Sequence, residues 1–310
     1  MLTAQESGVF AIAPTAFDDA GAIDFASMSR LAEFYGEVGC TGVTVLGIMG
    51  EAPKLAADEA QAVAAGMIRD FPGQVVVGVS APGFAGMRRL ARDVMDAGAA
   101  GVMIAPPSTL RTDEQILTYF EQAVEAIGTD IPWVLQDYPL ILSVVMTPRV
   151  IRSIIETLPS CVMLKHEDWP GLEKISRLRA FEREGSMRPI SILCGNGAMF
   201  LDFEMERGAD GAMTGYAFPD MLVDVVRLSQ DGRTDEAHDL FDAHLPLLRY
   251  EQQQGVGLAV RKYILAKRGI LASAAQRKPS GVLTEAAWRE VDYLLGRLAR
   301  LDPRAACTPA

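Results

Sequence analysis

The residue of this sequence that most clearly indicates chemistry is a lysine at the end of an apolar run. Lys165 follows the run from Cys161 to Leu164, which predicts a buried strand that ends at the amine. A lysine attacks a ketone only as the neutral amine, and removal from water favours that form. Lysines also end strands and point to solvent, so position alone leaves both interpretations open.

A tyrosine 27 residues earlier is a candidate partner for this lysine. Tyr138 follows the apolar run from Trp133 to Gln136, so it stands just past the end of another expected strand. A phenol can pass protons to and from a reacting carbon or nitrogen. The alternative is a packed tyrosine whose hydroxyl is satisfied by a neighbour.

A third candidate is the glycine-rich loop Gly47-Ile48-Met49-Gly50-Glu51, which leads from an apolar run toward a helix. Backbone amides at such a turn can bind an anion, including a carboxylate. Glycines are also common in ordinary strand-to-helix turns. The loop therefore indicates a binding site only together with the lysine and the tyrosine.

The sequence does not favour a metal or nucleotide cofactor. His166, Glu167 and Asp168 are potential ligands, but adjacent residues rarely converge on one ion, and only His238 and His244 remain elsewhere. Residues 82–86 lack the full GxGxxG order of a dinucleotide loop. We therefore expect chemistry without a cofactor.

Eight short apolar runs at fairly even spacing are the elements that must position these residues. Eight buried parallel strands are the number of a (β/α)8 TIM barrel. We expect these strands near Val9 to Ala13, Val43 to Leu46, Val75 to Val79, Val102 to Ala105, Trp133 to Gln136, Val162 to Lys165, Ile190 to Cys194 and Gly211 to Thr214. In such a barrel the active site lies at the C-terminal ends of the strands, where all three candidates fall.

The stretches between the runs are amphipathic and long enough for crossover helices, for example Asp24 to Tyr35, Glu59 to Arg69 and Asp113 to Ala126. Thr147 before Pro148 predicts a helix start, and Thr112 with Gln115 predicts a capping box. Three GxxG pairs precede apolar runs and indicate left-handed helix ends rather than phosphate loops. These pairs are Gly39 and Gly42, Gly98 and Gly101, and Gly208 and Gly211.

After Gly215 the pattern is helical throughout. Helices are expected at Leu222 to Leu228, Glu236 to Tyr250, Leu258 to Lys267 and Glu285 to Leu298. No linker rich in serine and glycine separates them from the barrel. We therefore expect one structural unit, with a catalytic barrel over residues 1–225 and a C-terminal helical extension over residues 226–310.

The composition and charge of the chain limit the kinds of molecule that it is expected to bind. The 310 residues are 49% hydrophobic and 22% charged, with a net charge of -11 and no apolar run long enough to cross a bilayer. The acidic balance argues against nucleic acid, and the N-terminus lacks the pattern of a secretory signal. The four cysteines are scattered, which indicates reduced thiols. A small-molecule partner and a cytoplasmic location are expected.

The order of these motifs resembles the dihydrodipicolinate synthase and N-acetylneuraminate lyase family. The shared features are GxxGE at residues 47–51, a Tyr-Pro loop at Tyr138 and a lysine 27 residues later. The opening residues 8–17, the turn at residues 105–107, the loop at residues 195–197 and the C-terminal helices also have counterparts. The resemblance covers nearly the whole chain.

The resemblance implies a lyase of the class I aldolase type. In such an enzyme Lys165 forms an imine with a 2-oxo acid, usually pyruvate, and Tyr138 shuttles protons. The backbone amides of Ile48 and Met49 would hold the carboxylate, while Gly195 and Met213 would line the floor. Gly47, Gly50 and Glu51 belong to the same expected binding loop. Members are commonly homotetramers, or dimers of the same pair.

Three positions depart from the dihydrodipicolinate synthase pattern. Ile48 and Met49 replace threonines that extend a proton relay from the tyrosine. The loop over residues 139–143 is short and uncharged where the synthases have an arginine for the second substrate. Ser108 stands where a neighbouring subunit usually contributes a second tyrosine, and Arg111 is the one nearby cation. The imine half of the site is retained and the acceptor half is changed.

The sequence therefore predicts a Schiff-base-forming lyase, an aldolase, dehydratase or synthase that acts on pyruvate or a related 2-oxo acid, with an aldehyde as a possible second substrate. Two other classes remain open. A relative that binds a 2-oxo acid without turnover would fit the missing hydroxyls. A phosphosugar isomerase would use amides after the seventh and eighth strands but would leave Lys165 and Tyr138 unexplained.

Overall fold

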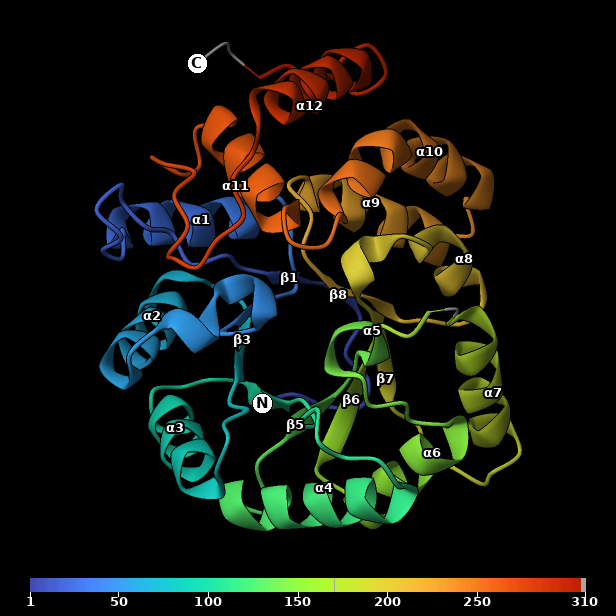
Figure 1. The fold of residues 1–310 in the computed structure, drawn as a ribbon. Helices are drawn as coiled ribbons and strands as arrows, with labels where there is room; N and C mark the ends of the chain where they lie inside the picture. Colours follow the sequence, from blue (N-terminus) through green and yellow to red (C-terminus); the bar gives the residue numbers. More distant parts are fainter. Residues whose placement is uncertain (170, 308–310) are drawn as a thin grey trace.

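Eight parallel strands form a closed barrel in the computed structural model, which describes residues 1–169 and 171–307 (Figure 1). Each strand pairs with the next along the chain, and the last pairs with the first. The strands are β1 Gly8–Ile12, β2 Gly42–Val45, β3 Gln74–Gly78, β4 Gly101–Ile104, β5 Trp133–Asp137, β6 Cys161–His166, β7 Ser191–Cys194 and β8 Gly211–Thr214. The expected (β/α)8 TIM barrel is confirmed, and each run agrees with its strand to within one or two residues.

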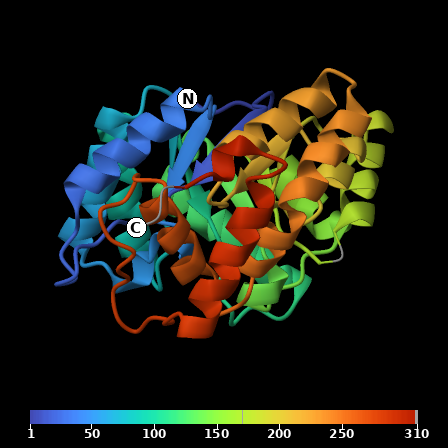
Figure 2. The same ribbon diagram turned by 90° about the horizontal axis from the view of Figure 1, so that it is seen from above.

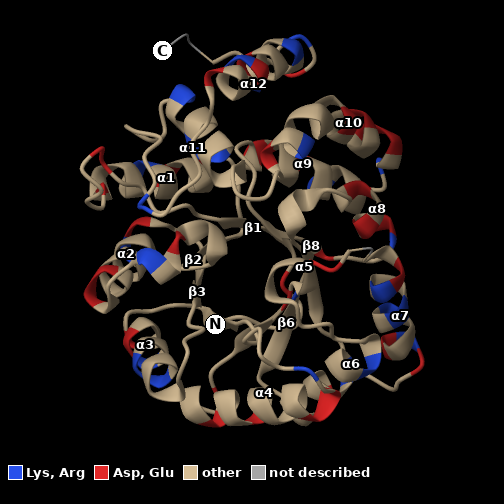
Figure 3. Ribbon diagram, in the orientation of Figure 1, with Lys and Arg blue, Asp and Glu red and all other residues tan. Residues whose placement is uncertain are grey.

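Helices surround the barrel and connect its strands. They are α1 Phe25–Glu37, α2 Ala57–Asp70, α3 Phe84–Asp96, α4 Asp113–Ile127, α6 Pro148–Thr157, α7 Leu172–Arg183, α8 Leu201–Glu206 and α9 Pro219–Gln230. Short helical turns at the strand ends are η1 Ile48–Gly50, η2 Ala52–Lys54, α5 Pro139–Leu142 and η3 Asn196–Ala198. Charged side chains lie mainly on the outer helices, whereas most of the barrel strands carry none (Figure 3).

The expected helix signals are present in the structure. The Thr147 hydroxyl accepts from the Val150 amide at the start of α6, and Thr112 with Gln115 forms the capping box of α4. Gly39, Gly98 and Gly208 have φ angles of 83°, 102° and 97°, so each permits a left-handed backbone where a helix ends.

The C-terminal helices pack along one side of the barrel, next to α1 and α9 (Figures 1 and 2). They are α10 Thr234–Glu251, α11 Gly257–Lys267 and α12 Glu285–Leu298, followed by η4 Pro303–Ala305. The boundary expected after residue 225 falls within α9, and residues 308–310 of the expected extension lie outside the described residues. None of the helices in the described part is long and apolar enough to cross a membrane.

Apolar side chains fill the barrel interior below its C-terminal mouth. Phe10, Met163, Leu193 and Met213 belong to this buried cluster, and Met49 packs against it from above. The cluster supports the residues at the strand ends and excludes water from beneath them. The barrel mouth therefore has an apolar floor.

Candidate active site

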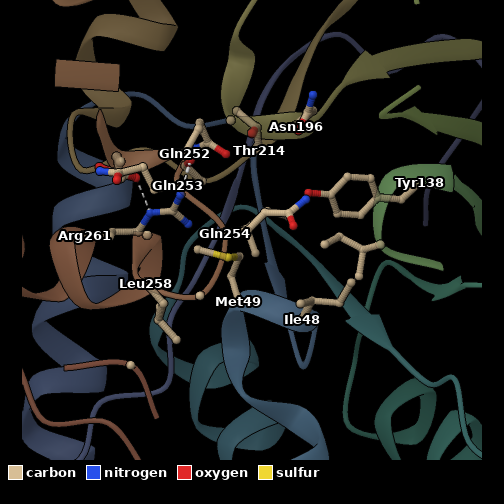
Figure 4. A pocket seen from close by; sticks show the side chains of 18 of the residues that line it. Ile48, Met49, Tyr138, Asn196, Thr214, Gln252, Gln253, Gln254, Leu258 and Arg261 are labelled. Carbon is tan, nitrogen blue, oxygen red and sulfur yellow. Dashed lines mark hydrogen bonds and ion pairs between the residues drawn. The ribbon is translucent and has the colours of Figure 1, made fainter. Parts of the chain in front are cut away.

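A cavity of about 310 Å³ opens at the C-terminal ends of the barrel strands. Its wall combines residues at the ends of β1, β5, β6 and β8 with the loops after β2, β5 and β7 and the segment between α10 and α11. The lining includes Gln136, Lys165 and Glu167, together with Ile48, Met49, Tyr138, Asn196, Thr214 and Arg261. The last six are labelled in Figure 4. Lys165 and Tyr138, taken from the sequence as the catalytic pair, line the same cavity.

Lys165 is the penultimate residue of β6 and is 5% exposed. The strand register places it beside Gln136 of β5 and Leu193 of β7. Its Nζ lies 3.0 Å from Oε1 of Glu167. Because side chains alternate along a strand, Lys165 and Glu167 point to the same side while His166 between them points away. The amine is thus buried in the barrel mouth beside the carboxylate of Glu167.

Glu167 is held in place by neighbours on both sides. The Gln136 side chain donates to Oε1 at 2.7 Å, and the backbone amide of Asn196 donates to Oε2 at 3.1 Å. Gly195 leaves room for this carboxylate, because a Cβ at that position would lie 2.3 Å from Cγ of Glu167. Glu167 is therefore oriented to exchange a proton at Lys165.

Tyr138 directs its hydroxyl into the cavity from the loop after β5 (Figure 4). Its backbone carbonyl accepts from the Leu142 amide at 2.9 Å and so begins the short helix α5. Burial raises the pKa of the Tyr138 phenol to about 12, with a further increase from Glu167 and an opposing effect from Arg261. The phenol is protonated at neutral pH and can donate a proton.

The loop after β2 forms the opposite wall. Ile48 and Met49 line the cavity as the first residues of η1, whose leading N–H groups have no acceptor within the helix. The Thr15 hydroxyl donates to the Gly50 carbonyl at 2.6 Å and fixes the turn. This wall could therefore present backbone donors to an anionic group.

Glu51 closes this loop but faces away from the cavity. Its carboxylate lies 2.6 Å from Lys262 Nζ and 2.7 Å from Lys54 Nζ, and it accepts from the Arg277 amide at 3.2 Å. Glu51 is 2% exposed. The contacts tie the loop after β2 to α11 and to the segment before α12.

Five residues expected to bind substrate stand behind the lining that the structure describes. Gly47 precedes η1, Gly50 is its last residue, and Glu51 follows it. Gly195 makes room for Glu167, and Met213 lies in the barrel interior one residue before Thr214. Their direct contact with substrate stays a prediction, whereas the positions show how they shape the wall.

The remaining polar residues at the ends of β5 and β6 point toward α7. Lys174 Nζ lies 2.8 Å from Asp137 Oδ2 and 2.5 Å from Asp168 Oδ2. His166 is fully buried, with Nδ1 3.8 Å from Asp137 Oδ2. Lys174 thus bridges Asp137 and Asp168 behind the strands, and neither these residues nor His166 line the cavity.

Several polar residues that line the cavity were not predicted from the sequence, among them Glu167, Gln136 and Arg261. Glu167 was considered only as a metal ligand, although its spacing of two from Lys165 on a strand would have placed both on one face. Gln136 was taken only as the end of a strand. Arg261 comes from α11 and has no sequence signal, because its partner Glu251 lies on a different helix, with Nε donating to Glu251 Oε1 at 2.5 Å.

The family model described as the dihydrodipicolinate synthetase family matches residues 5–297 of this chain. The chain belongs to this family. It is therefore a lyase, as its relatives are named for dehydratase and synthase activities. The resemblance seen in the motifs is confirmed over nearly the whole length.

Individual relatives carry different names. The chain is 30% identical over 307 residues to L-2-keto-3-deoxyarabonate dehydratase of Azospirillum brasilense, which covers 97% of this chain and 96% of that protein. It is 27% identical over 245 residues to 4-hydroxy-tetrahydrodipicolinate synthase of Methanothrix thermoacetophila, with coverage of 78% and 80%. A crystal structure of dihydrodipicolinate synthase from Rhodopseudomonas palustris is 72% identical, with a TM-score of 0.95 and coverage of 96% and 99%.

Proposed function

We propose that Lys165 forms a Schiff base with the ketone of a 2-oxo acid, either pyruvate or a hydroxylated sugar-acid derivative. The observation that carries the proposal is the buried Lys165 amine, 3.0 Å from Glu167, in a cavity that also receives the Tyr138 hydroxyl. The dehydratase relative, named for a 3-deoxy-2-keto sugar acid, supports the hydroxylated class.

The reaction begins when Lys165 Nζ adds to the carbonyl carbon and gives a carbinolamine. Loss of its hydroxyl as water, with a proton from Tyr138 or Glu167, gives the iminium. The iminium draws electrons from C3, so a C3 proton can leave to the same groups. In a substrate with a hydroxyl on C4, the resulting enamine expels that hydroxyl as water, with a proton from Tyr138 or Glu167. Alternatively the iminium keeps its C3 protons, the C4 hydroxyl gives its proton to one of these groups, and the C3–C4 bond breaks to release an aldehyde and leave the enamine.

The backbone amides of Ile48 and Met49 are proposed to hold the substrate carboxylate. They stand at the exposed start of η1, on the wall that Gly47, Gly50 and Glu51 shape. Gly195 and Met213 complete the floor below the reacting carbon. No metal or cofactor enters this chemistry, since the covalent imine with Lys165 supplies the electron sink.

A trapping experiment tests the proposal. Borohydride with pyruvate should add the mass of a reduced pyruvyl imine to the peptide that carries Lys165, and Lys165→Ala should abolish the adduct. Lys54→Ala is the matched control, because Lys54 also lines the cavity and is likewise paired with a carboxylate, that of Glu51, but does not stand on a barrel strand. Labelling that persists without Lys165, or that never occurs with any 2-oxo acid, would rule out the mechanism.

A second candidate is condensation of pyruvate with an aldehyde, as in the synthases. The 72% identical structure named dihydrodipicolinate synthase favours it. The imine step is the same in both candidates, so the second substrate distinguishes them. From its family membership we also propose that the protein is a homo-oligomer, either a tetramer or a dimer. We propose a cytoplasmic location on the same basis.

A further inference from the structure

Arg261 is a buried arginine in the cavity wall, and one of its guanidinium nitrogens has no hydrogen-bond acceptor among the described residues. It is 2% exposed, Nε donates to Glu251, and Nη2 donates to the Gly215 carbonyl at 2.5 Å. Nη1 has no acceptor among the described residues. Buried guanidinium donors are normally paired, so an unpaired one in a cavity wall indicates a group that binds there.

The end of β8 is shaped around this guanidinium. Gly215 follows Thr214, the last residue of β8, and a Cβ at position 215 would lie 1.9 Å from Nη1 of Arg261. The absence of a side chain there lets the guanidinium reach the barrel mouth beside Thr214. In Figure 4 the guanidinium nitrogen that carries no dashed line points away from the bonded pair. This nitrogen is buried, and Arg261 is one of the residues that line the cavity.

Two glutamines of the segment between α10 and α11 extend this polar wall. The Gln252 amide packs directly on Gly197, where a Cβ would lie 1.9 Å from its Nε2. The Gln254 side chain and the hydroxyl end of Tyr138 point toward one another in Figure 4. Gln253, between them, is already engaged and donates to the Tyr250 carbonyl at 2.9 Å. Gln252 and Gln254 thus offer amides to the cavity from one side.

The charges of the wall select what these groups can bind. Three cationic side chains line the cavity in the described part of the chain, and each has its own carboxylate. Lys54 lies 2.7 Å from Glu51, Lys165 lies 3.0 Å from Glu167, and Arg261 lies 2.5 Å from Glu251. A second carboxylate on the ligand would meet no free charge here. A hydroxyl, which both donates and accepts, suits amides and a charge-compensated guanidinium.

We infer that Arg261, Gln252 and Gln254 form a subsite for the hydroxyl groups on the tail of the 2-oxo acid whose ketone reacts with Lys165. The inference rests on the proposed function and specifies its substrate: an acid that carries hydroxyls beyond C3. The wall lies on α11 and on the segment before it, outside the barrel strands that carry the reacting groups. Tail recognition and imine chemistry are therefore separate parts of the cavity.

A competition between two acids of equal chain length tests this subsite. An equimolar mixture of a 2-keto-3-deoxypentonate and 2-oxopentanoate is trapped briefly with borohydride, and mass spectrometry gives the ratio of the two adducts on Lys165. The wild-type protein should favour the hydroxylated adduct. Gln252→Leu and Gln254→Leu should each reduce the ratio by up to about tenfold, the upper end of what one hydrogen bond contributes.

Gln253→Leu is the matched control and should leave the ratio unchanged, because its side chain is bonded to the backbone. Arg261→Lys should reduce the ratio further while it keeps a charge near Glu251; if that variant does not fold, the glutamine variants still decide the question. Equal trapping of both acids by the wild type, or an unchanged ratio in both glutamine variants, would overturn the subsite alone. Absence of any adduct in the wild type would overturn the proposed function and the subsite together.

Discussion

The Lys165 amine and the Glu167 carboxylate lie 3.0 Å apart in the mouth of the barrel, two residues apart on the same strand end. The carboxylate is fixed by Gln136 and by the Asn196 amide, so its position does not depend on the lysine. A base that stays in place while the lysine becomes an imine can accept and return protons in successive steps.

Glu167→Gln should therefore reduce turnover by roughly 10²- to 10⁴-fold, the range of general acid–base catalysis. The amide can still accept from Gln136, so the fold should be kept. The measurement is kcat on a 2-oxo acid substrate, with the rate of borohydride trapping as the second readout. Turnover within about threefold of the wild type would leave Glu167 with a structural role only.

Tyr138→Phe removes the hydroxyl that faces the cavity and keeps the ring. Because burial raises the pKa of this phenol to about 12, the phenol is a proton donor at neutral pH. Its loss should also reduce kcat by roughly 10²- to 10⁴-fold. Tyr119→Phe is a control outside the cavity, on α4, where a phenol of similar pKa lies behind the barrel wall. An equal effect of both changes would indicate packing rather than proton transfer.

The sequence was sufficient to predict the barrel and to place Lys165 and Tyr138 at its C-terminal mouth. Strands buried on both faces produce continuous apolar runs, and parallel connectivity brings their C-terminal ends together, so Lys165 and Tyr138 could be expected in one cavity. The lysine's partner Glu167 was within reach of the same reasoning, since alternation along β6 puts residues 165 and 167 on one face.

The C-terminal wall could not be predicted in the same way. Arg261 reaches the cavity only because Gly215 leaves space and Glu251 holds its Nε, and these contacts join three separate elements. Glu51 illustrates the opposite case. Its place in the binding motif suggested contact with substrate, whereas tertiary packing pairs it with Lys262 and Lys54. Local patterns do not specify such long-range ion pairs.

A buried carboxyl behind the site makes stability depend on pH. Burial raises the pKa of Glu204 on α8 from 4.5 to about 7, against opposing effects of His166 and the Cys194 thiol. Between about pH 4.5 and 7 the folded protein keeps a proton that the unfolded chain releases. The contribution of Glu204 to stability therefore falls as pH rises through this window, by at most about 3 kcal/mol.

Glu204→Gln removes this titration. The free energy of unfolding of the variant, relative to the wild type, should rise between pH 4.5 and pH 7 and stay constant above it. Urea unfolding at fixed protein concentration measures the difference, since any oligomer makes stability depend on concentration. Glu125→Gln, at an exposed position of α4, controls for the change in net charge. Parallel pH profiles for Glu204→Gln and the wild type would contradict the shifted pKa.

The last prediction concerns an aldehyde that carries its own carboxylate. Binding such a group requires a cation free to form charge-assisted hydrogen bonds, and a guanidinium is the usual one. Residues 139–143 supply none, and the cations that line the described cavity are each engaged by a carboxylate. Arg111 donates to the carbonyls of Ser108 and Leu110 in its own exposed loop.

Aspartate semialdehyde should therefore be a poor acceptor for the Lys165 imine of pyruvate. A carboxylate left desolvated without a partner reduces specificity by on the order of a hundredfold or more. The measurement is kcat/KM for aspartate semialdehyde at saturating pyruvate, beside the same constant for an uncharged hydroxyaldehyde. Arg111→Ala serves as the control, because a further loss would show that Arg111 acts from a neighbouring subunit. A kcat/KM of roughly 10⁴ M⁻¹s⁻¹ or more for the semialdehyde would show a carboxylate clamp in the assembled enzyme and favour the synthase reaction.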